Sequence, residues 1–225
     1  MVKKRNKWKP GRWAAAAILT LGLMVNAAVP ATAVAEEPNL QLLKPQTDSQ
    51  PFLQILAKRV SSRVYSAQPL PLQALSDLLW SADGISRPTS GKRTAPTANN
   101  KQEIDVYVVM EKGIYLYDAK GNMLKMVVPG DHRGATGIQP YVKDAALNLV
   151  YVADFDKSGG KSDEDKLLYA AAATGFISEN VYLYCASAGL ATVIRAYVDR
   201  PALAEIMKLR VNQKIILAQT VGYPK

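Results

Sequence analysis

Three polar side chains at alternating positions form the first group that could do chemistry. Residues 58–66 read KRVSSRVYS, so Arg59, Ser61 and Arg63 recur at every second residue. An extended segment would place all three on one side, whereas helical spacing would spread them around a cylinder. Two guanidinium forks and a hydroxyl on one side suit an anion such as a phosphate. The simpler alternative is a solvated helix end, where positive charge is favourable at the C-terminus.

A second polar group lies in residues 92–108, which read KRTAPTANNKQEIDVYV. From Ile104 the segment alternates apolar and polar residues, as a half-buried strand does. The residues before it are Pro, small residues, paired Asn and a Gln. They form either a solvated connector or a loop that holds something polar. We expect a long loop over residues 84–103 as a whole, because Gly, Pro, Ser, Thr and Asn are frequent there.

Cysteine and histidine usage excludes several kinds of site. Cys185 is the one cysteine, so no intrachain disulfide can form, and its apolar neighbours favour a buried small residue over a catalytic thiol. His132 is the one histidine, so a multi-histidine metal site cannot be built. A Ser-His-Asp triad that used it would lack the Gly-x-Ser-x-Gly elbow. We expect His132 on a loop surface, and no metal site.

The first 35 residues have the pattern of a secretory signal peptide. Six basic residues precede an apolar run at residues 13–25, and Ala33-Val34-Ala35 offers a small-x-small cleavage site. An uncleaved membrane anchor is the alternative. The apolar run is short for a span of roughly 20 residues, and Asn26 and Pro30 come soon after it. We expect cleavage after Ala35, a periplasmic or secreted location, and membrane contact only during export.

Removal of the signal changes the charge argument. The whole chain has 28 basic and 19 acidic residues, a net charge of +9. Six of the basic residues and none of the acidic ones lie in residues 1–35, so the mature chain is 22 minus 19, or +3. The high charge of the precursor is largely a targeting feature. It is no evidence for a nucleic-acid partner, and we expect none.

The rest of the chain predicts a flexible lead at residues 36–50 and one α+β domain over residues 51–225. Apolar periodicity predicts helices over residues 52–60, 70–85, 166–188 and 199–209. It predicts strands over residues 103–110, 147–152, 190–198 and 213–224, and a hairpin over 113–128. The helix at 166–188 is apolar nearly all round, which suggests burial in a core or at a subunit interface.

The order and spacing of these features resemble the nitroreductase superfamily of flavin enzymes. The family's Arg-x-Ser-x-Arg/Lys-x-aromatic segment is matched by RVSSRVY at residues 59–65, and its Ala-Pro-Ser-x-x-Asn-x-Gln loop by APTANNKQ at 95–102. Glu-Asn at 179–180, Gly-Leu at 189–190 and Gly-Tyr-Pro at 222–224 come next, in the family's order. The hairpin resembles the branch of SagB-like and azoline-oxidising dehydrogenases. The family's loop commonly continues Gln-Pro-Trp, whereas this one continues Gln102-Glu103-Ile104, which leaves the substrate unassigned.

The resemblance implies a nitroreductase-like fold with a central, mostly antiparallel sheet flanked by helices. It also implies a homodimer with FMN between the subunits. Arg59 and Ser61 would hold the phosphate and ribityl end, and Arg63 would lie near the pyrimidine edge, where a cation stabilises the charge of the reduced flavin. Further contacts are implied for Thr97 and Asn100 with the flavin of the other subunit, for Gln139 as a flavin-edge amide, and for the segment around Arg195 near the reactive face.

The implied activity is that of an exported FMN-dependent oxidoreductase. It would use ping-pong two-electron transfer to or from a small organic substrate, with the hydride chemistry supplied by the cofactor. A protein exported unfolded must acquire FMN outside the cytoplasm, so NAD(P)H is not assumed as the donor. The alternative is a non-catalytic binding module that keeps the fold without flavin chemistry. No catalytic proton donor is assigned.

Overall fold

The computed structural model describes residues 39–45 and 51–225, and the predicted signal peptide lies outside them. The helices are α1 (Phe52–Lys58), α2 (Leu72–Asp83), α3 (Asp163–Ala188) and α4 (Arg200–Ile206), with 3-10 turns η1 (Ala98–Asn100), η2 (Arg133–Thr136) and η3 (Pro140–Lys143). The strands are β1 (Leu40–Gln41), β2 (Ile85–Arg87), β3 (Lys92–Arg93), β4 (Ile104–Met110), β5 (Gly113–Asp118), β6 (Met123–Pro129), β7 (Leu147–Asp154), β8 (Ala191–Arg195) and β9 (Gln213–Gly222). The predicted α+β class is confirmed.

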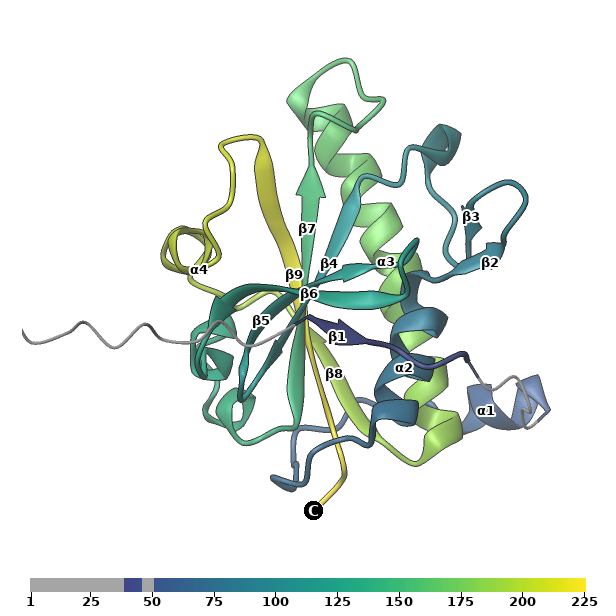
Figure 1. The fold of residues 1–225 in the computed structure, drawn as a ribbon, viewed down its shortest axis with the longest axis vertical. Coiled ribbons are helices and arrows are strands. Elements are labelled where there is room, and N and C mark those ends of the chain that lie inside the picture. The colour runs from purple at the N-terminus through teal and green to yellow at the C-terminus, as the bar shows by residue number, and fades with distance from the viewer. Residues whose placement is uncertain (1–38, 46–50) are drawn as a thin grey trace, which may run out of the picture. The chain divides into compact units, whose positions relative to one another are not determined.

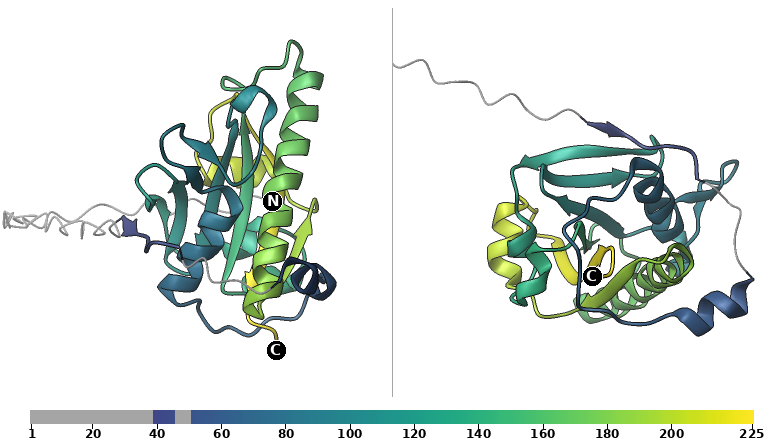
Figure 2. Two further views of the ribbon diagram at one scale, coloured as in Figure 1. Left: turned by 90° about the vertical axis from the view of Figure 1, so that its right-hand side faces the viewer. Right: turned by 90° about the horizontal axis from the view of Figure 1, so that it is seen from below.

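A seven-stranded sheet organises the described chain, in the order β1-β6-β5-β4-β7-β9-β8. Neighbouring strands pair antiparallel throughout it. Helices α2 and α3 lie together against one face, and α4 lies against the other (Figures 1 and 2). This is the helix-flanked antiparallel sheet that the sequence predicted.

Side-chain alternation along the central strands explains the two covered faces. On β4, Val106 and Val108 face the core under α2 and α3, whereas Tyr107 and Val109 face the smaller core under α4. All eight residues of β7 are buried, because this strand lies mid-sheet with helices on both sides. A strand covered on both faces is expected to be mainly apolar, as most of the predicted strand at 147–152 is. Its polar residue, Asn148, is buried with hydrogen bonds to the Val142 carbonyl, Arg195 Nη2 and Thr220 Oγ1.

Helix α3 begins three residues before the predicted Lys166. The Ser162 side chain caps it by accepting the Asp165 N–H at 3.1 Å, and three acidic residues occupy the first turn. Acidic side chains are favourable at a helix N-terminus, so the acidic residues before Lys166 belong to the helix. The helix ends at Gly189 as predicted, with φ of 68°.

The two long faces of α3 differ in surroundings. One face, which includes Ile177, Val181 and Cys185, is buried in the main core. The opposite stripe is exposed although it is apolar; its members are Leu168, Ala171, Ala172, Gly175 and Phe176. The all-round apolar character of this helix therefore reflects one buried and one uncovered face. Within the described residues, no helix combines the length and apolarity that crossing a membrane requires.

Two segments predicted as irregular contain short strands. Within the predicted lead, Leu40–Gln41 pairs with the edge strand β6, and Leu42 is buried. Within the predicted loop 84–103, strands β2 and β3 form a separate two-stranded sheet. These strands are two or three residues long, too short to show an apolar period.

Candidate functional site

The segment that comes after α1 is extended and is held against the sheet. Residues 59–64 lie outside any helix. The Ser62 N–H donates to the Thr192 carbonyl of β8 at 2.9 Å. The alternating polar residues of this segment therefore stand on extended backbone, which is the condition for them to share one side.

Tyr182 of α3 organises the start of this segment. Its hydroxyl hydrogen-bonds Ser61 Oγ at 2.8 Å and accepts the Ile194 N–H of β8 at 3.0 Å. The Arg59 guanidinium lies 5.3 Å from the centre of the Tyr182 ring, within cation–π range. One buried tyrosine thus joins the extended segment, α3 and β8. From the sequence alone Tyr182 cannot be told from Tyr184, because nothing local distinguishes the two tyrosines.

The donors of this segment remain open to solvent. Ser61 and Arg63 are exposed and Arg59 is half-buried. Arg63 has no hydrogen bond or ion pair within the described residues. Two guanidinium groups and a hydroxyl, held on rigid backbone, fit the phosphate and oxygen-rich chain of a flavin mononucleotide.

The second predicted cluster is a turn at residues 97–102, here called the Asn-rich turn. The Thr97 hydroxyl accepts the Gln102 N–H at 2.9 Å, and the Asn100 N–H donates to the Thr97 carbonyl at 3.1 Å. Asn100 Oδ1 accepts from Gln102 Nε2 at 3.2 Å. Thr97 and Asn100 are therefore brought together, with Asn100 exposed.

The third cluster joins Gln139 and Arg195 around Gly137. A Cβ placed on Gly137 would lie 2.2 Å from Arg195 Nη1 and 2.9 Å from Gln139 Oε1. Glycine is thus required here by close approach of two side chains. Gln139 Oε1 is buried without a hydrogen-bond partner in the described part of the chain, so it is an acceptor that an N–H donor could satisfy.

The Arg195 side chain is committed to internal contacts. Its Nε donates to Thr220 Oγ1 at 3.0 Å, and its Nη2 donates to Thr136 Oγ1 at 3.0 Å and to Asn148 Oδ1 at 2.8 Å. Its Nη1 donates to the Thr136 carbonyl. Burial lowers the pKa of Arg195 to about 10. The guanidinium therefore ties the end of β8 to η2, β7 and β9.

The three clusters are not gathered at one point of the subunit. The Tyr182–Ile194 bond connects the extended segment to β8, the strand that carries Arg195. The Asn-rich turn instead lies beyond β2 and β3, at the opposite end of α3 from α1 (Figures 1 and 2). Within one chain, the Asn-rich turn therefore lies away from a ligand bound at Arg59.

Cys185 and His132, which were not assigned to the site, lie in the core and on a loop. Cys185 is fully buried, and burial raises the pKa of its thiol. His132 is half-buried on a loop, with Nε2 3.0 Å from the Pro129 carbonyl. Among the described residues, no group of three or more His, Cys, Asp and Glu side chains could hold a metal ion.

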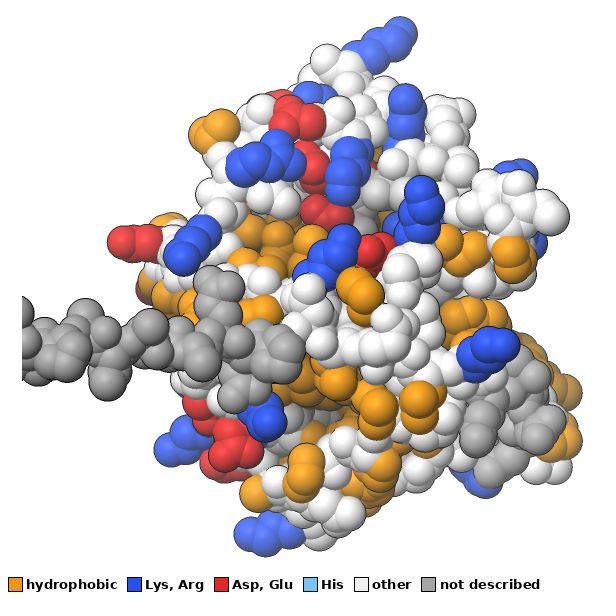
Figure 3. All heavy atoms as spheres, viewed as in Figure 1, with side chains coloured by type: hydrophobic (Ala, Val, Ile, Leu, Met, Phe, Trp, Pro, Cys, Tyr) orange, Lys and Arg blue, Asp and Glu red, His pale blue; other side chains and the backbone are white. Residues whose placement is uncertain are grey.

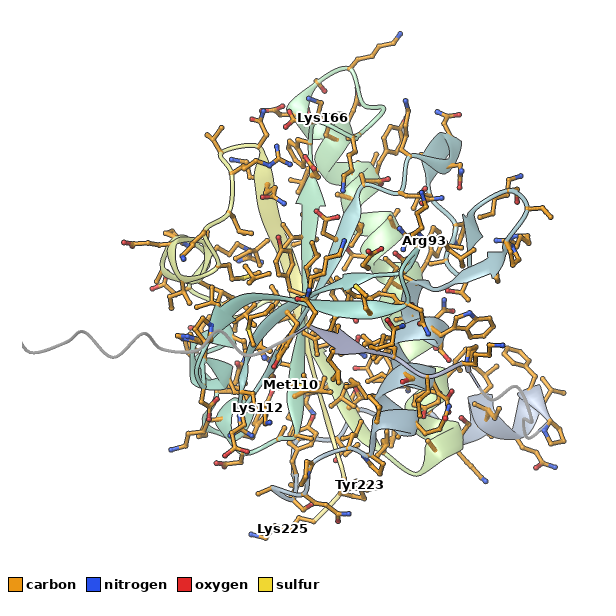
Figure 4. The ribbon with its side chains drawn as sticks, viewed as in Figure 1. Arg93, Met110, Lys112, Lys166, Tyr223 and Lys225 are labelled. Carbon is orange, nitrogen blue, oxygen red and sulfur yellow. The ribbon has the colours of Figure 1, made fainter. Side chains whose placement is uncertain are left out.

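A cavity of about 400 Å³ lies between β1, the start of α2 and the turn after β4. Met110 and Lys112, both labelled in Figure 4, are among its lining residues. Its other walls are mainly aliphatic. None of the seven predicted site residues lines this cavity.

Comparison with known proteins decides the family. The family model for the nitroreductase family matches residues 56–223, a range that spans all three clusters. The chain belongs to the nitroreductase family. As a member of this family, the chain is an oxidoreductase.

Two relatives support the assignment along the chain. A "Putative nitroreductase" of Methanocaldococcus jannaschii is 28% identical over 167 residues, which cover 69% of this chain and 83% of that protein. The crystal structure of a "putative nitroreductase" from Ralstonia eutropha JMP134 is 40% identical with a TM-score of 0.81. The match covers 86% of this chain and 92% of the Ralstonia eutropha chain.

A third structure is similar in fold. It is the Escherichia coli microcin synthetase McbBCD complex with bound truncated pro-MccB17, at 18% identity and a TM-score of 0.64. The match covers 82% of this chain and 77% of that chain. At this identity the likeness bears on the fold alone.

Proposed function

We propose that this nitroreductase-family protein is an exported FMN-dependent oxidoreductase of the SagB-like branch. It acts by ping-pong two-electron transfer to or from a small organic substrate. The observation that carries the proposal is the arrangement at Tyr182, which holds Arg59 and Ser61 on an extended, solvent-facing segment. Membership of the family leads us to expect a flavin. The hydrogen-bond donors Arg59, Ser61 and Arg63 are of the kind that binds a flavin phosphate.

The roles proposed for individual residues are those that the family resemblance implies. Arg59 and Ser61 bind the phosphate and ribityl end, and exposed Arg63 supplies a positive charge near the pyrimidine edge. Gln139 contributes its unsatisfied amide oxygen. When bound, FMN supplies the hydride chemistry. The chain supplies position and charge.

A homodimer completes the site. The exposed stripe of α3 presents Leu168 and Phe176, which are 66% and 49% exposed, and α1 presents Leu53 at 75%. Figure 3 shows hydrophobic side chains along the lower right edge of that view, on the side where α1 lies in Figure 1. Exposed apolar side chains on both helices favour an association face here. In the proposed dimer, two subunits pair through these residues of α1 and α3. The Asn-rich turn of one subunit then reaches the flavin held by the other.

Export is inferred from the signal-peptide pattern of residues 1–35, with cleavage after Ala35 and a periplasmic or secreted destination. The electron donor there is left open, since NAD(P)H is made in the cytoplasm. The alternative function is a non-catalytic binding module of the same fold.

The proposal is tested by titrating residues 36–225 with FMN and following flavin fluorescence. Arg63→Ala is expected to weaken FMN binding on the order of tenfold, the size of one charge-assisted hydrogen bond. Lys120→Ala, which removes a cation from the exposed β5–β6 turn, is the control and is expected to bind as the wild type does. Equal affinity of Arg63→Ala and wild type would remove Arg63 from the site.

A further inference from the structure

The Asn-rich turn holds an unfavourable backbone conformation. Asn99, Asn100 and Gln102 have φ values of 51°, 54° and 50°. Non-glycine residues rarely occupy this left-handed region, and Gln has less tolerance for it than Asn. Three such residues within four positions do not stay in place by local preference. The surrounding structure must hold them.

Gln102 is the residue through which the turn is held. Its backbone N–H donates to Thr97 Oγ1 at 2.9 Å. Its Nε2 donates to the Gly91 carbonyl at 3.0 Å and to Asn100 Oδ1 at 3.2 Å, and its Oε1 accepts from Arg93 Nε at 2.9 Å. The side chain of Gln102 therefore links the exposed Asn100 to strand β3.

Arg93 carries this link onward to helix α2. Its Nη1 donates to the Asp83 carbonyl at 2.8 Å and to Asp83 Oδ2 at 2.9 Å. Figure 4 labels Arg93 beside the β2–β3 pair. Asp83 is the last residue of α2 and is 3% exposed. A continuous chain of charge-assisted and neutral hydrogen bonds thus runs from Asp83 through Arg93 and Gln102 to Asn100.

We infer that Arg93 is a positioning residue that fixes Asn100 for the flavin, and that the charge on Asp83 controls how firmly it does so. This inference rests on the proposed function, in which Asn100 contacts the flavin bound by the other subunit. With Asp83 ionised, Arg93 is clamped and its Nε stays aimed at Gln102. With Asp83 neutral, the clamp loses its charge and the strained turn loosens.

The surroundings of Asp83 raise its pKa, so that the carboxyl gains or loses its charge near neutral pH. Burial raises the pKa of Asp83 to about 7, against the opposing effect of Arg93, and the charges of Asp105 and Glu103 raise it further. Tyr117 also lies near this carboxyl, and its hydroxyl and both oxygens of Glu103 are buried without partners in the described chain. Arg93 is therefore the cation on which Asp83 depends.

The test compares FMN dissociation constants at pH 6 and pH 8 for the wild type and for Asp83→Asn, which keeps the side-chain oxygen but cannot ionise. The phosphate of FMN titrates in both proteins, so its contribution cancels in the comparison. We expect the wild type to lose affinity from pH 8 to pH 6 by about fivefold more than the variant does. Equal pH dependence in the two proteins would overturn the inference.

A second pair of variants tests Arg93 itself. Arg93→Lys keeps the charge but cannot bridge Asp83 and Gln102 at once, because an ammonium lacks the planar fork. We expect its FMN affinity at pH 8 to fall to that of Asp83→Asn. Lys92→Ala, the loss of an exposed cation from the adjacent position, is the control with unchanged affinity. Wild-type affinity in Arg93→Lys would contradict the positioning role.

Hydrogen exchange of the flavin-free protein separates this inference from the proposed function. After correction for intrinsic rates, amides of residues 97–102 are expected to exchange faster at pH 6 than at pH 8 in the wild type. In Asp83→Asn they should exchange fast at both. If neither the wild type nor the variants bind FMN, the proposed function fails. The exchange difference then still tests whether Asp83 and Arg93 hold the Asn-rich turn in place. Identical exchange in both proteins at both pH values would refute it.

Discussion

The hydroxyl of Tyr182 lies 2.8 Å from Ser61 Oγ, and this contact fixes the extended segment to the long helix α3. The same hydroxyl accepts the backbone N–H of Ile194 at 3.0 Å. One side chain therefore sets the distance between the segment that offers Arg59 and the strand β8. Tyr182 of α3 is therefore a structural centre of the candidate site.

Tyr182→Phe is expected to lower the free energy of unfolding by about 1–2 kcal/mol, because the buried Ile194 N–H loses its acceptor. FMN affinity should fall several-fold as Ser61 loses its anchor. Tyr184→Phe is the matched control, since its hydroxyl donates to the Ala74 carbonyl at 3.0 Å, away from the segment. Urea unfolding and FMN titration measure the two effects. Equal FMN affinity in both variants would show that the Tyr182 hydroxyl does not support the site.

Gly137→Ala is expected to destabilise the protein by about 2 kcal/mol, the usual cost of forced overpacking. The added Cβ would lie 2.2 Å from Arg195 Nη1, whose guanidinium is fixed by its own hydrogen bonds. Gly134→Ala is the control in the same loop, because its Cβ would lie 3.8 Å from the nearest atom, Lys143 Cβ. Thermal unfolding compares them, and a loss no larger for Gly137→Ala than for Gly134→Ala would contradict the crowding argument.

Phe176→Glu is expected to dissociate the proposed dimer, because it places a charge in the apolar stripe of α3. FMN binding should be lost with the dimer, since the Asn-rich turn then has no partner flavin to reach. Val211→Glu makes the same kind of change at a residue that is 83% exposed and outside the stripe, and should leave the dimer intact. Sedimentation velocity reads the mass. A wild-type monomer that binds FMN fully would refute the shared site.

Asp83→Asn is expected to change the pH dependence of stability in a defined direction. The folded pKa of Asp83 is about 7, above its ordinary 3.8, so the native state holds more protons than the unfolded state between these values. The stability that Asp83 contributes is therefore full below about pH 4 and is lost as pH rises to 7. The unfolding free energy of the wild type minus that of the variant should fall from pH 4.5 to pH 7.5. A constant or rising difference would contradict the raised pKa.

Much of the fold follows from apolar periodicity, because long elements repeat their pattern several times. The strand at β7 and the buried face of α3 show this most clearly. The missed features are short or depend on distant partners. Leu40–Gln41 is a strand only because β6 offers an unpaired edge. The start of α3 was predictable from Ser162 and the acidic residues after it, which have the pattern of a helix N-terminus.

The candidate site was less accessible to sequence reasoning. The alternation of Arg59 and Ser61 left both an extended segment and a solvated helix end open, and the structure places both residues outside any helix. The internal role of the Arg195 guanidinium could not be read locally, since its acceptors lie 25 to 59 positions away in sequence. The chain of hydrogen bonds from Asp83 to Asn100 likewise depends on contacts that only the folded chain creates.

The most direct test of the account is the absorption spectrum of the purified protein, residues 36–225, prepared with FMN present. Released cofactor would be identified by mass spectrometry and counted per chain. The account predicts a flavin spectrum with about one FMN per chain in a dimer, as expected for a site shared between subunits. A colourless protein that also fails to bind added FMN would contradict it, and would leave a nitroreductase fold that serves as a binding module.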